Sequence, residues 1–342
     1  MLRSSTLTFN ACLDVLKALG EPTRLRLARL LSSSDLTVSD LTAILGQSQP
    51  RISRHLKLLV ESAVLTRYQE GAWAFFRLTE EVAVVDLVRG VLSRIDAADP
   101  VLRRDAERLD AVRRQRAERA AGYFSANAGN WDRIRLLHAP DAEVERALLR
   151  AVGDRRIEGF LDIGTGTGRM LEIFSPRAER AVGIDASREM LQVARAKLDT
   201  AGIGNAQVRL GDCYHLPVPH GSFDLVTIHQ VLHYLDDPAA AIREAAQALR
   251  PGGRLAIVDF APHRLDFLRD EHAHLRLGFS RDTLVSHLEE AGLDVVAQET
   301  LAPDGSAPGQ LTVFIWVAGD RRRLLADTAK EKPRASPSVT VL

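Results

Sequence analysis

The stretch from Phe160 to Arg169, Phe-Leu-Asp-Ile-Gly-Thr-Gly-Thr-Gly-Arg, constrains the fold more than any other part of the chain. Its apolar first half is typical of a buried strand, and three alternate glycines, Gly164, Gly166 and Gly168, break this strand into a turn before a helix. Because glycine has no Cβ, its backbone can adopt positive φ and a ligand can lie directly against the chain. The pattern therefore predicts the binding turn of an α/β domain.

The spacing of these glycines differs from the dinucleotide fingerprint G-x-G-x-x-G, which would place a glycine where Arg169 stands. The chain has D-x-G-x-G-x-G from Asp162, and a second acid, Asp185, follows the next predicted strand, Arg180–Ile184. A carboxylate there can accept both hydroxyls of a ribose, through charge-assisted hydrogen bonds worth about 1.5 to 3 kcal/mol each. The spacing indicates a nucleoside ligand without a pyrophosphate.

Five blocks of sequence share one order and spacing, namely Asp162–Gly168, Gly183–Asp185, Gly211–Asp212, Phe223–Val226 and Arg250–Gly253. Together they resemble the S-adenosylmethionine (SAM) site of class I methyltransferases of the UbiE-like group. The resemblance implies SAM as cofactor, S-adenosylhomocysteine (SAH) as product and no metal. The alternative is an unrelated nucleotide-binding α/β domain.

The same resemblance implies a role for individual residues. The glycine turn would pass under the methionine part, Asp185 would bind the ribose, and Asp212 would accept the adenine amino group. The complete set of implied cofactor-binding residues is Asp162, Gly164, Thr165, Gly166, Gly168, Asp185, Ala186, Ser187, Met190, Gly211, Asp212, Cys213 and His229.

Methyl transfer from SAM depends on positioning and desolvation, so that a base helps only when the nucleophile is protonated. Three histidines follow predicted strand ends on the ligand side and are the candidate catalytic residues: His229, His233 and His263. A structural hydrogen-bonding role is the alternative for each. The segment Phe260–Gly278 is expected to cap the pocket of the methyl acceptor.

The N-terminal part has the pattern of a winged helix-turn-helix. Apolar spacing predicts four helices and then two strands, with the fourth helix at Gln49–Ser62 and the strands at Val64–Gln69 and Trp73–Leu78. The fourth helix buries Ile52 and Leu56 on one side. Its other side is basic and carries an amide, which suits a DNA major groove. The predicted DNA contacts on this side are Ser48, Gln49, Arg51, Ser53, Arg54, His55 and Lys57.

The segments Glu21–Leu27 and Ser48–Leu59, with the predicted wing behind them, resemble the ArsR family of bacterial repressors. The resemblance covers about residues 10 to 80 and implies a double-stranded DNA operator as partner. It also implies a homodimer through the first helix and Val82–Ile95, and so a palindromic operator. Thr37 and Ser39 stand where metal-sensing members carry cysteines, so metal sensing is not expected. A protein-interaction module is the alternative.

The length of 342 residues allows two domains. We predict a DNA-binding and dimerisation domain over 1–98, a helical linker over 99–122, a cofactor domain over 123–318 and a disordered tail over 319–342. The linker holds seven arginines between Val101 and Ala121. These either contact DNA phosphates or, as we favour, pair at helical spacing with acids of the same helix, namely Asp105, Glu107, Asp110 and Glu118.

The overall composition excludes several classes of protein. The formal net charge is zero, and the only two cysteines, Cys12 and Cys213, argue against a disulfide framework. The chain shows no run of eighteen apolar residues and no secretory leader, so we expect a soluble cytoplasmic protein without a membrane partner.

The predicted fold class is α/β, with an N-terminal winged helix-turn-helix domain and a Rossmann-like domain whose seven-stranded sheet is mostly parallel and ends in an antiparallel strand. The leading hypothesis is a DNA-binding regulator whose second domain methylates a small-molecule acceptor or senses SAM and SAH. The alternative is a small-molecule methyltransferase whose DNA-binding domain is secondary. The sequence His229-Gln-Val-Leu232 differs from the motif of amino-directed DNA methyltransferases, so DNA is not the expected acceptor.

Overall fold

The structure, a computed structural model, describes residues 6–70, 73–79, 81–131, 134, 141–303 and 310–321. It divides the chain into two compact units. The first unit is Met1–Ala120 with His263–Leu277, and the second is Ala121–Pro262 with Gly278–Leu342. Of the disordered tail that the sequence predicts over 319–342, residues 319 and 320 instead form the end of a strand, and residues from 322 onward lie outside the described residues.

The first unit has the helices of a helix-turn-helix: α1 (Phe9–Leu19), α2 (Pro22–Leu31), α3 (Val38–Leu45), α4 (Gln49–Glu61) and α5 (Val82–Leu92). A reciprocal capping box of Thr37 and Asp40 starts α3, and Gly46 ends it with φ of 64°. Ser48 occupies the N-cap of α4, but its side chain makes no capping hydrogen bond within the described chain. Apolar faces of all five helices meet in one core.

The wing consists of β2 (Leu65–Glu70) and β3 (Trp73–Leu78), which pair antiparallel, with β1 (Leu36–Thr37) on the other side of β3. The segment 263–277, which contains α12 (Phe267–Glu271), belongs to this unit. Its Arg269 guanidinium lies 5.4 Å from the Phe75 ring centroid, and Arg276 Nη1 lies 3.4 Å from both Asp35 Oδ2 and Tyr68 Oη.

The sequence predicts that Phe260–Gly278 covers an acceptor pocket, whereas the structure groups 263–277 with the winged helix. The physical reason is that the wing presents aromatic rings, Tyr68 stacked on Phe75 at 5.6 Å, to which arginine guanidinium groups bind well.

The helix α6 (Pro100–Asn127) leads out of the first unit. Asp105, 3% exposed, accepts two hydrogen bonds of 2.6 Å from Arg26 of α2. Arg116 donates a hydrogen bond of 2.5 Å to Oδ2 of Asp40, which belongs to the capping box of α3. The prediction that Asp105 pairs within its own helix is therefore wrong, because a carboxylate turned toward the core needs a partner from the element packed against it.

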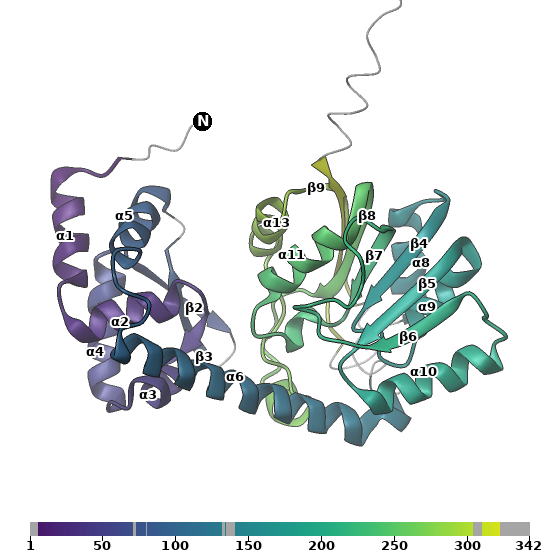
Figure 1. Ribbon diagram of the computed structural model, residues 1–342, viewed down its shortest axis with the longest axis horizontal. Helices are drawn as coiled ribbons and strands as arrows, with labels where there is room; N and C mark the ends of the chain where they lie inside the picture. Colours follow the sequence, from purple (N-terminus) through teal and green to yellow (C-terminus); the bar gives the residue numbers. More distant parts are fainter. Residues whose placement is uncertain are drawn as a thin grey trace, which may run out of the picture. The chain divides into compact units, whose positions relative to one another are not determined.

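The second unit contains a seven-stranded sheet in the order β6-β5-β4-β7-β8-β10-β9 (Figure 1). Its strands are β4 (Ile157–Ile163), β5 (Ala178–Asp185), β6 (Ala206–Leu210), β7 (Phe223–His229), β8 (Leu249–Phe260), β9 (Leu293–Leu301) and β10 (Val313–Asp320). The pairs from β6 to β8 are parallel, and β10 is antiparallel to both of its neighbours. The predicted sheet with a last antiparallel strand is confirmed.

Helices cover both faces of this sheet (Figure 1). They are α8 (Asp141–Val152), α9 (Arg169–Phe174), α10 (Arg188–Thr200), α11 (Pro238–Ala248) and α13 (Arg281–Glu290). Side chains of β4 alternate between the two faces. On one face Phe160 packs on Phe174 of α9, with their ring centroids 4.9 Å apart. On the other face Leu161 joins the core formed with α11 and α13. The strands β4 to β8 all run in one direction, which brings their carboxyl ends to one edge of the sheet.

Candidate functional site

The glycine turn leaves β4 at that edge. Gly164, Gly166 and Gly168 have φ of 70°, 52° and 87°, a region that side-chain-bearing residues rarely adopt. A Cβ built on Gly164 would lie 2.4 Å from Val231 Cγ2, so no side chain fits there. The corresponding position on Gly166 is 3.6 Å from Trp131 Nε1. The turn is thus free of side chains, and the sequence patterns did not identify Val231 as its neighbour.

Asp185, the last residue of β5, is hydrogen-bonded to this turn. Its Oδ2 accepts a hydrogen bond from Gly166 N and its Oδ1 accepts one from Ser187 N, both at 2.8 Å. Burial raises the pKa of Asp185, and the backbone N–H donors of Ser187, Gly166 and Ala186 oppose that shift. Since each carboxylate oxygen can accept a second hydrogen bond, the group still fits a vicinal diol.

The other predicted cofactor residues near these two strands differ in exposure. Asp162, 1% exposed, accepts a hydrogen bond of 2.6 Å from Thr227 Oγ1. Ser187 caps α10 by accepting from Met190 N at 3.2 Å, and Met190 is 1% exposed. Thr165 is buried and Ala186 is exposed. The resemblance implies Ala186, Ser187 and Met190 beside the adenine, and of these three only Ala186 lies open at the surface.

The loop after β6 carries Gly211, Asp212 and Cys213. Asp212 is exposed, and its Oδ1 accepts a hydrogen bond from Tyr214 N at 2.9 Å. Burial, helped by the charge of Asp212, raises the pKa of the Cys213 thiol to about 12. The thiol is therefore protonated at neutral pH, which suits a packing role better than a nucleophilic one.

The three candidate histidines lie in different surroundings. His229 ends β7 and is 8% exposed. His233 lies just beyond it in the short helix η3 (Leu232–Tyr234), and its Nδ1 is 2.8 Å from Oδ1 of Asp259 in β8. His263 belongs to the first compact unit, where its Nδ1 accepts from Leu265 N at 3.3 Å.

The structure thus groups His229 and His233 at the end of β7 and assigns His263 to the other unit. Sequence reasoning missed Asp259, although an acid at the end of a predicted strand on the ligand side was a signal for it.

On α4 the predicted DNA contacts fall on the exposed side, with one exception. The exposed residues are Ser48, Gln49, Arg51, Ser53, Arg54 and Lys57. His55 has 14% of its side chain exposed, and its Nδ1 lies 3.5 Å from Glu21 Oε2. The described residues hold no cluster of three or more His, Cys, Asp or Glu side chains suited to a metal ion. Within the described ranges no helix combines the length and apolarity that a bilayer span requires.

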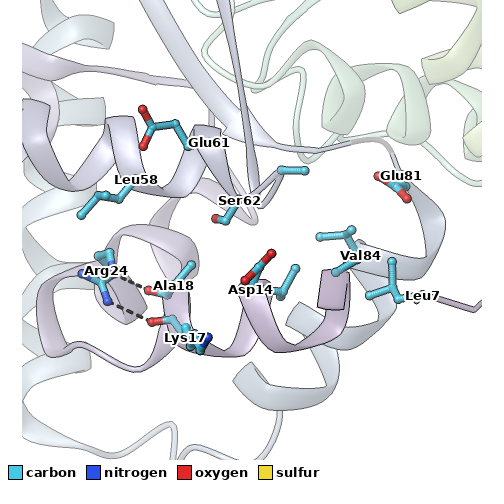
Figure 2. A pocket seen from close by; sticks show the side chains of 13 residues that line it. Leu7, Asp14, Lys17, Ala18, Arg24, Leu58, Glu61, Ser62, Glu81 and Val84 are labelled. Atoms are coloured by element: carbon cyan, nitrogen blue, oxygen red, sulfur yellow. Dashed lines mark hydrogen bonds between the residues drawn. The ribbon is translucent and has the colours of Figure 1, made fainter. Parts of the chain in front are cut away.

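The first unit also has an open hollow of about 600 Å³ between α1, the end of α4 and the start of α5. Figure 2 shows Leu58, Leu7 and Val84 around it together with acidic and basic side chains. Arg24 closes one end, where it donates to the carbonyls of Ala18 and, at 3.0 Å, Lys17. Apolar side chains of α1 are exposed nearby, including Phe9 at 80% and Leu16 at 44%.

Two family patterns match the chain. The pattern described as a methyltransferase domain matches residues 161–257, and the one described as a bacterial regulatory protein of the arsR family matches residues 21–64. The first match begins in β4 and includes the glycine turn. The second includes all of α4.

Individual relatives agree with the first pattern. The chain is 37% identical over 134 residues to the uncharacterized methyltransferase YcgJ of Bacillus subtilis, covering 39% of this chain and 51% of the relative. It is 30% identical over 162 residues to the ubiquinone/menaquinone biosynthesis C-methyltransferase UbiE of Geobacter sp., covering 46% of this chain and 69% of the relative.

The N-methyltransferase NodS of Bradyrhizobium japonicum superimposes with a TM-score of 0.49 at 22% identity, covering 59% of this chain and 98% of that one. The chain spans 51%, 32% and 37% of the length of the first curated relatives that it matches, about half or less. With the glycine turn, the sheet order and both family matches in view, the chain belongs to the class I methyltransferases and joins such a domain to an ArsR-type helix-turn-helix.

Proposed function

We propose that the second unit binds SAM and SAH at the glycine turn. The observation that carries this proposal is the hydrogen bond between Asp185 and Gly166, which sets a carboxylate against a turn of positive-φ glycines in which Gly164 has no room for a side chain. A ribose diol fits the carboxylate, and the methionine part of the ligand, which carries an ammonium and a carboxylate, can lie against the glycine turn. In this proposal Asp212 and Ala186 meet the adenine, and Asp162 and His229 lie toward the methionine and the sulfonium.

The bound cofactor would supply an activated methyl group, and the chain would supply position and desolvation. The short connection after β7, which contains Val231 and His233, lies against the glycine turn because Val231 fills the space over Gly164. We propose His229 and His233 as the histidines closest to the reaction; His263 belongs to the first unit and has no part in this proposal.

The first unit, in this proposal, binds duplex DNA through the exposed side of α4. The ArsR-family match includes residues 21–64, and Arg51, Arg54 and Lys57 are exposed on that helix. The exposed apolar side chains of α1 and the hollow beside them (Figure 2) suit a second copy of the chain. A two-fold dimer would present two α4 helices to a palindromic operator, in the cytoplasm where chromosomal DNA lies.

We propose that the whole chain is a transcriptional regulator whose second unit methylates a small molecule or reports the SAM to SAH balance. The helix α6 supports a link between the two activities. Its Arg116 holds the α3 cap through Asp40, while Tyr123 and Phe124, two turns further on, belong to the second unit. Sensing requires a ligand to bind the DNA-competent and incompetent states with different affinity.

The test is a titration of the full chain with the DNA upstream of its own gene, alone and with saturating SAM or SAH. A regulator that senses should show an operator Kd that differs severalfold between the two ligands. An operator Kd unaffected by either ligand would favour the alternative, a small-molecule methyltransferase with a secondary DNA-binding domain. Failure to bind that DNA under all three conditions would contradict the regulator.

Arg54→Ala should weaken operator binding about tenfold or more, since one arginine contact to a base edge is worth roughly 1 to 3 kcal/mol. The control is Arg155→Ala, which removes an exposed arginine from the second unit. Binding is read by fluorescence anisotropy at fixed salt, and calorimetry with SAH checks that the cofactor site is unchanged. Equal losses for the two variants would show a general charge effect and remove the role assigned to α4.

A further inference from the structure

Four aromatic side chains gather in the second unit beside the glycine turn. Phe124 is at the centre, with ring centroids 4.8 Å from Tyr234, 5.3 Å from Trp131 and 5.7 Å from Tyr123. The contacts are edge-to-face, and all four residues are only partly buried. Since Trp131 Nε1 lies 3.6 Å from the Cβ position of Gly166, the cluster forms an aromatic wall next to the turn.

A buried carboxylate lies behind this wall. Asp259 is 0% exposed, and its Oδ1 binds His233 Nδ1 and Phe260 N, both at 2.8 Å. Its Oδ2 is also buried and makes no hydrogen bond with any described residue. His233 is 1% exposed, and its ring lies 4.0 Å from Tyr234, a member of the wall. A buried carboxylate with an unsatisfied oxygen is costly unless a cation or a donor meets it.

The tyrosines of the wall do not supply that charge. Burial raises the pKa of Tyr123 to about 12. Burial, together with the nearby Tyr123 and Asp259, raises the pKa of Tyr234 well above its ordinary value of 10. Both phenols are therefore neutral at physiological pH, and neither is a cation or a phenolate base. A ligand that carries a cation would supply the missing charge.

We propose that Asp259, with His233 and the wall of Phe124, Trp131 and Tyr234, binds a primary or secondary amine as the methyl acceptor. This inference rests on the proposed SAM site, because it concerns the acceptor that lies beside it. An ammonium group neutralises the buried carboxylate and is attracted by aromatic faces. An alcohol or a carbon acid offers no charge to either, so the same site would bind it less well.

The arrangement also accounts for the protons. With Asp259 ionised, His233 donates its Nδ1 proton to Oδ1 and carries a lone pair on Nε2. The ammonium transfers one proton to Oδ2 of Asp259, the oxygen that it meets, and the nitrogen lone pair then forms a bond to the sulfonium methyl. The carbon–sulfur bond breaks with its electron pair remaining on sulfur, which becomes neutral. The product is the methylated ammonium, and the proton on Asp259 passes to water.

The experiment uses the full chain saturated with SAH and measures binding by calorimetry of two matched pairs, benzylamine with benzyl alcohol and isopropylamine with isopropanol. We expect at least one amine to bind at least tenfold more tightly than its alcohol at neutral pH. Asp259→Asn, which keeps the shape and removes the charge, should abolish that preference. The control His220→Gln changes an exposed histidine of the same unit and should leave it intact.

Trp131→Leu provides a second variant if Asp259→Asn does not fold, because Trp131 is partly exposed. It should reduce the preference for the amine over the alcohol at least threefold. Equal binding of amine and alcohol in both pairs, or a preference that survives Asp259→Asn or Trp131→Leu, would overturn the inference. If the chain still binds SAH in that case, the proposed cofactor site remains. If the wild-type chain does not bind SAH, both proposals fall.

Discussion

Asp185→Ala is expected to weaken the binding of SAH by at least tenfold while the second unit stays folded. The carboxylate is proposed to accept the two ribose hydroxyls, and hydrogen bonds to a charged acceptor contribute about 1.5 to 3 kcal/mol each. Loss of one such bond is enough for a tenfold change. Two backbone donors, Gly166 N and Ser187 N, also lose their acceptor, so the turn should become less ordered without SAH.

Calorimetry with SAH measures this effect, and near-ultraviolet circular dichroism reports on the fold. Glu179→Ala is the matched control on the same strand, because Glu179 is exposed and pairs with Arg156 away from the turn. If Asp185→Ala binds SAH as tightly as wild type does, the assignment of Asp185 to the ribose is wrong. If Asp185→Ala and Glu179→Ala lose equal SAH affinity, the effect comes from a disturbance of β5 and not from the Asp185 carboxylate.

The same carboxylate predicts a pH dependence with a definite sign. Burial raises the pKa of Asp185 in the folded protein above its unfolded value, so the ionised group opposes folding and this cost disappears as pH falls through the folded pKa. A ribose-binding carboxylate needs the ionised form. On acidification, SAH affinity should therefore begin to fall at a higher pH than it would for an ordinary aspartate, and Asp185→Ala should lack that loss.

Asp105→Ala is expected to lower the free energy of unfolding of the first unit by about 3 kcal/mol, as is typical when one partner of a buried ion pair is removed. Asp105 is 4% exposed at its side chain and Arg26 is 19% exposed, and the two share a pair of hydrogen bonds of 2.6 Å. Without the carboxylate, the guanidinium is left largely desolvated between α2 and α6. Urea unfolding followed by circular dichroism measures the change.

The control for this variant is Glu107→Ala, which removes an exposed carboxylate from the same helix, α6. Glu107 and Arg103 are 3.8 Å apart, but their side chains are 70% and 69% exposed. Glu107→Ala should therefore cost less than about 0.5 kcal/mol. If Arg26→Met combined with Asp105→Leu recovers most of the stability, the loss comes from the stranded charge. Equal effects of Asp105→Ala and Glu107→Ala would contradict the buried pair.

Features that depend on neighbouring residues were predictable from the sequence. The glycine turn follows from a local requirement for positive φ, and the acid that ends β5 follows from strand periodicity. The exposed side of α4 follows from the helical repeat of Ile52 and Leu56. His55 was assigned to that exposed side, but only 14% of its side chain is exposed, and its Nδ1 lies 3.5 Å from Oε2 of Glu21, which is outside the helix.

By itself the sequence determined the two domain types, the bare turn, and the basic side of α4, because each depends on residues a few positions apart. Only the tertiary structure decided which distant side chains meet. Arg26 and Asp105 are 79 positions apart, and His233 and Asp259 are 26 positions apart. The grouping of 263–277 with the winged helix is of the same kind. Such contacts depend on how helices and strands pack, and the repeat of apolar residues within each element carries no information about which partner its buried charges will face.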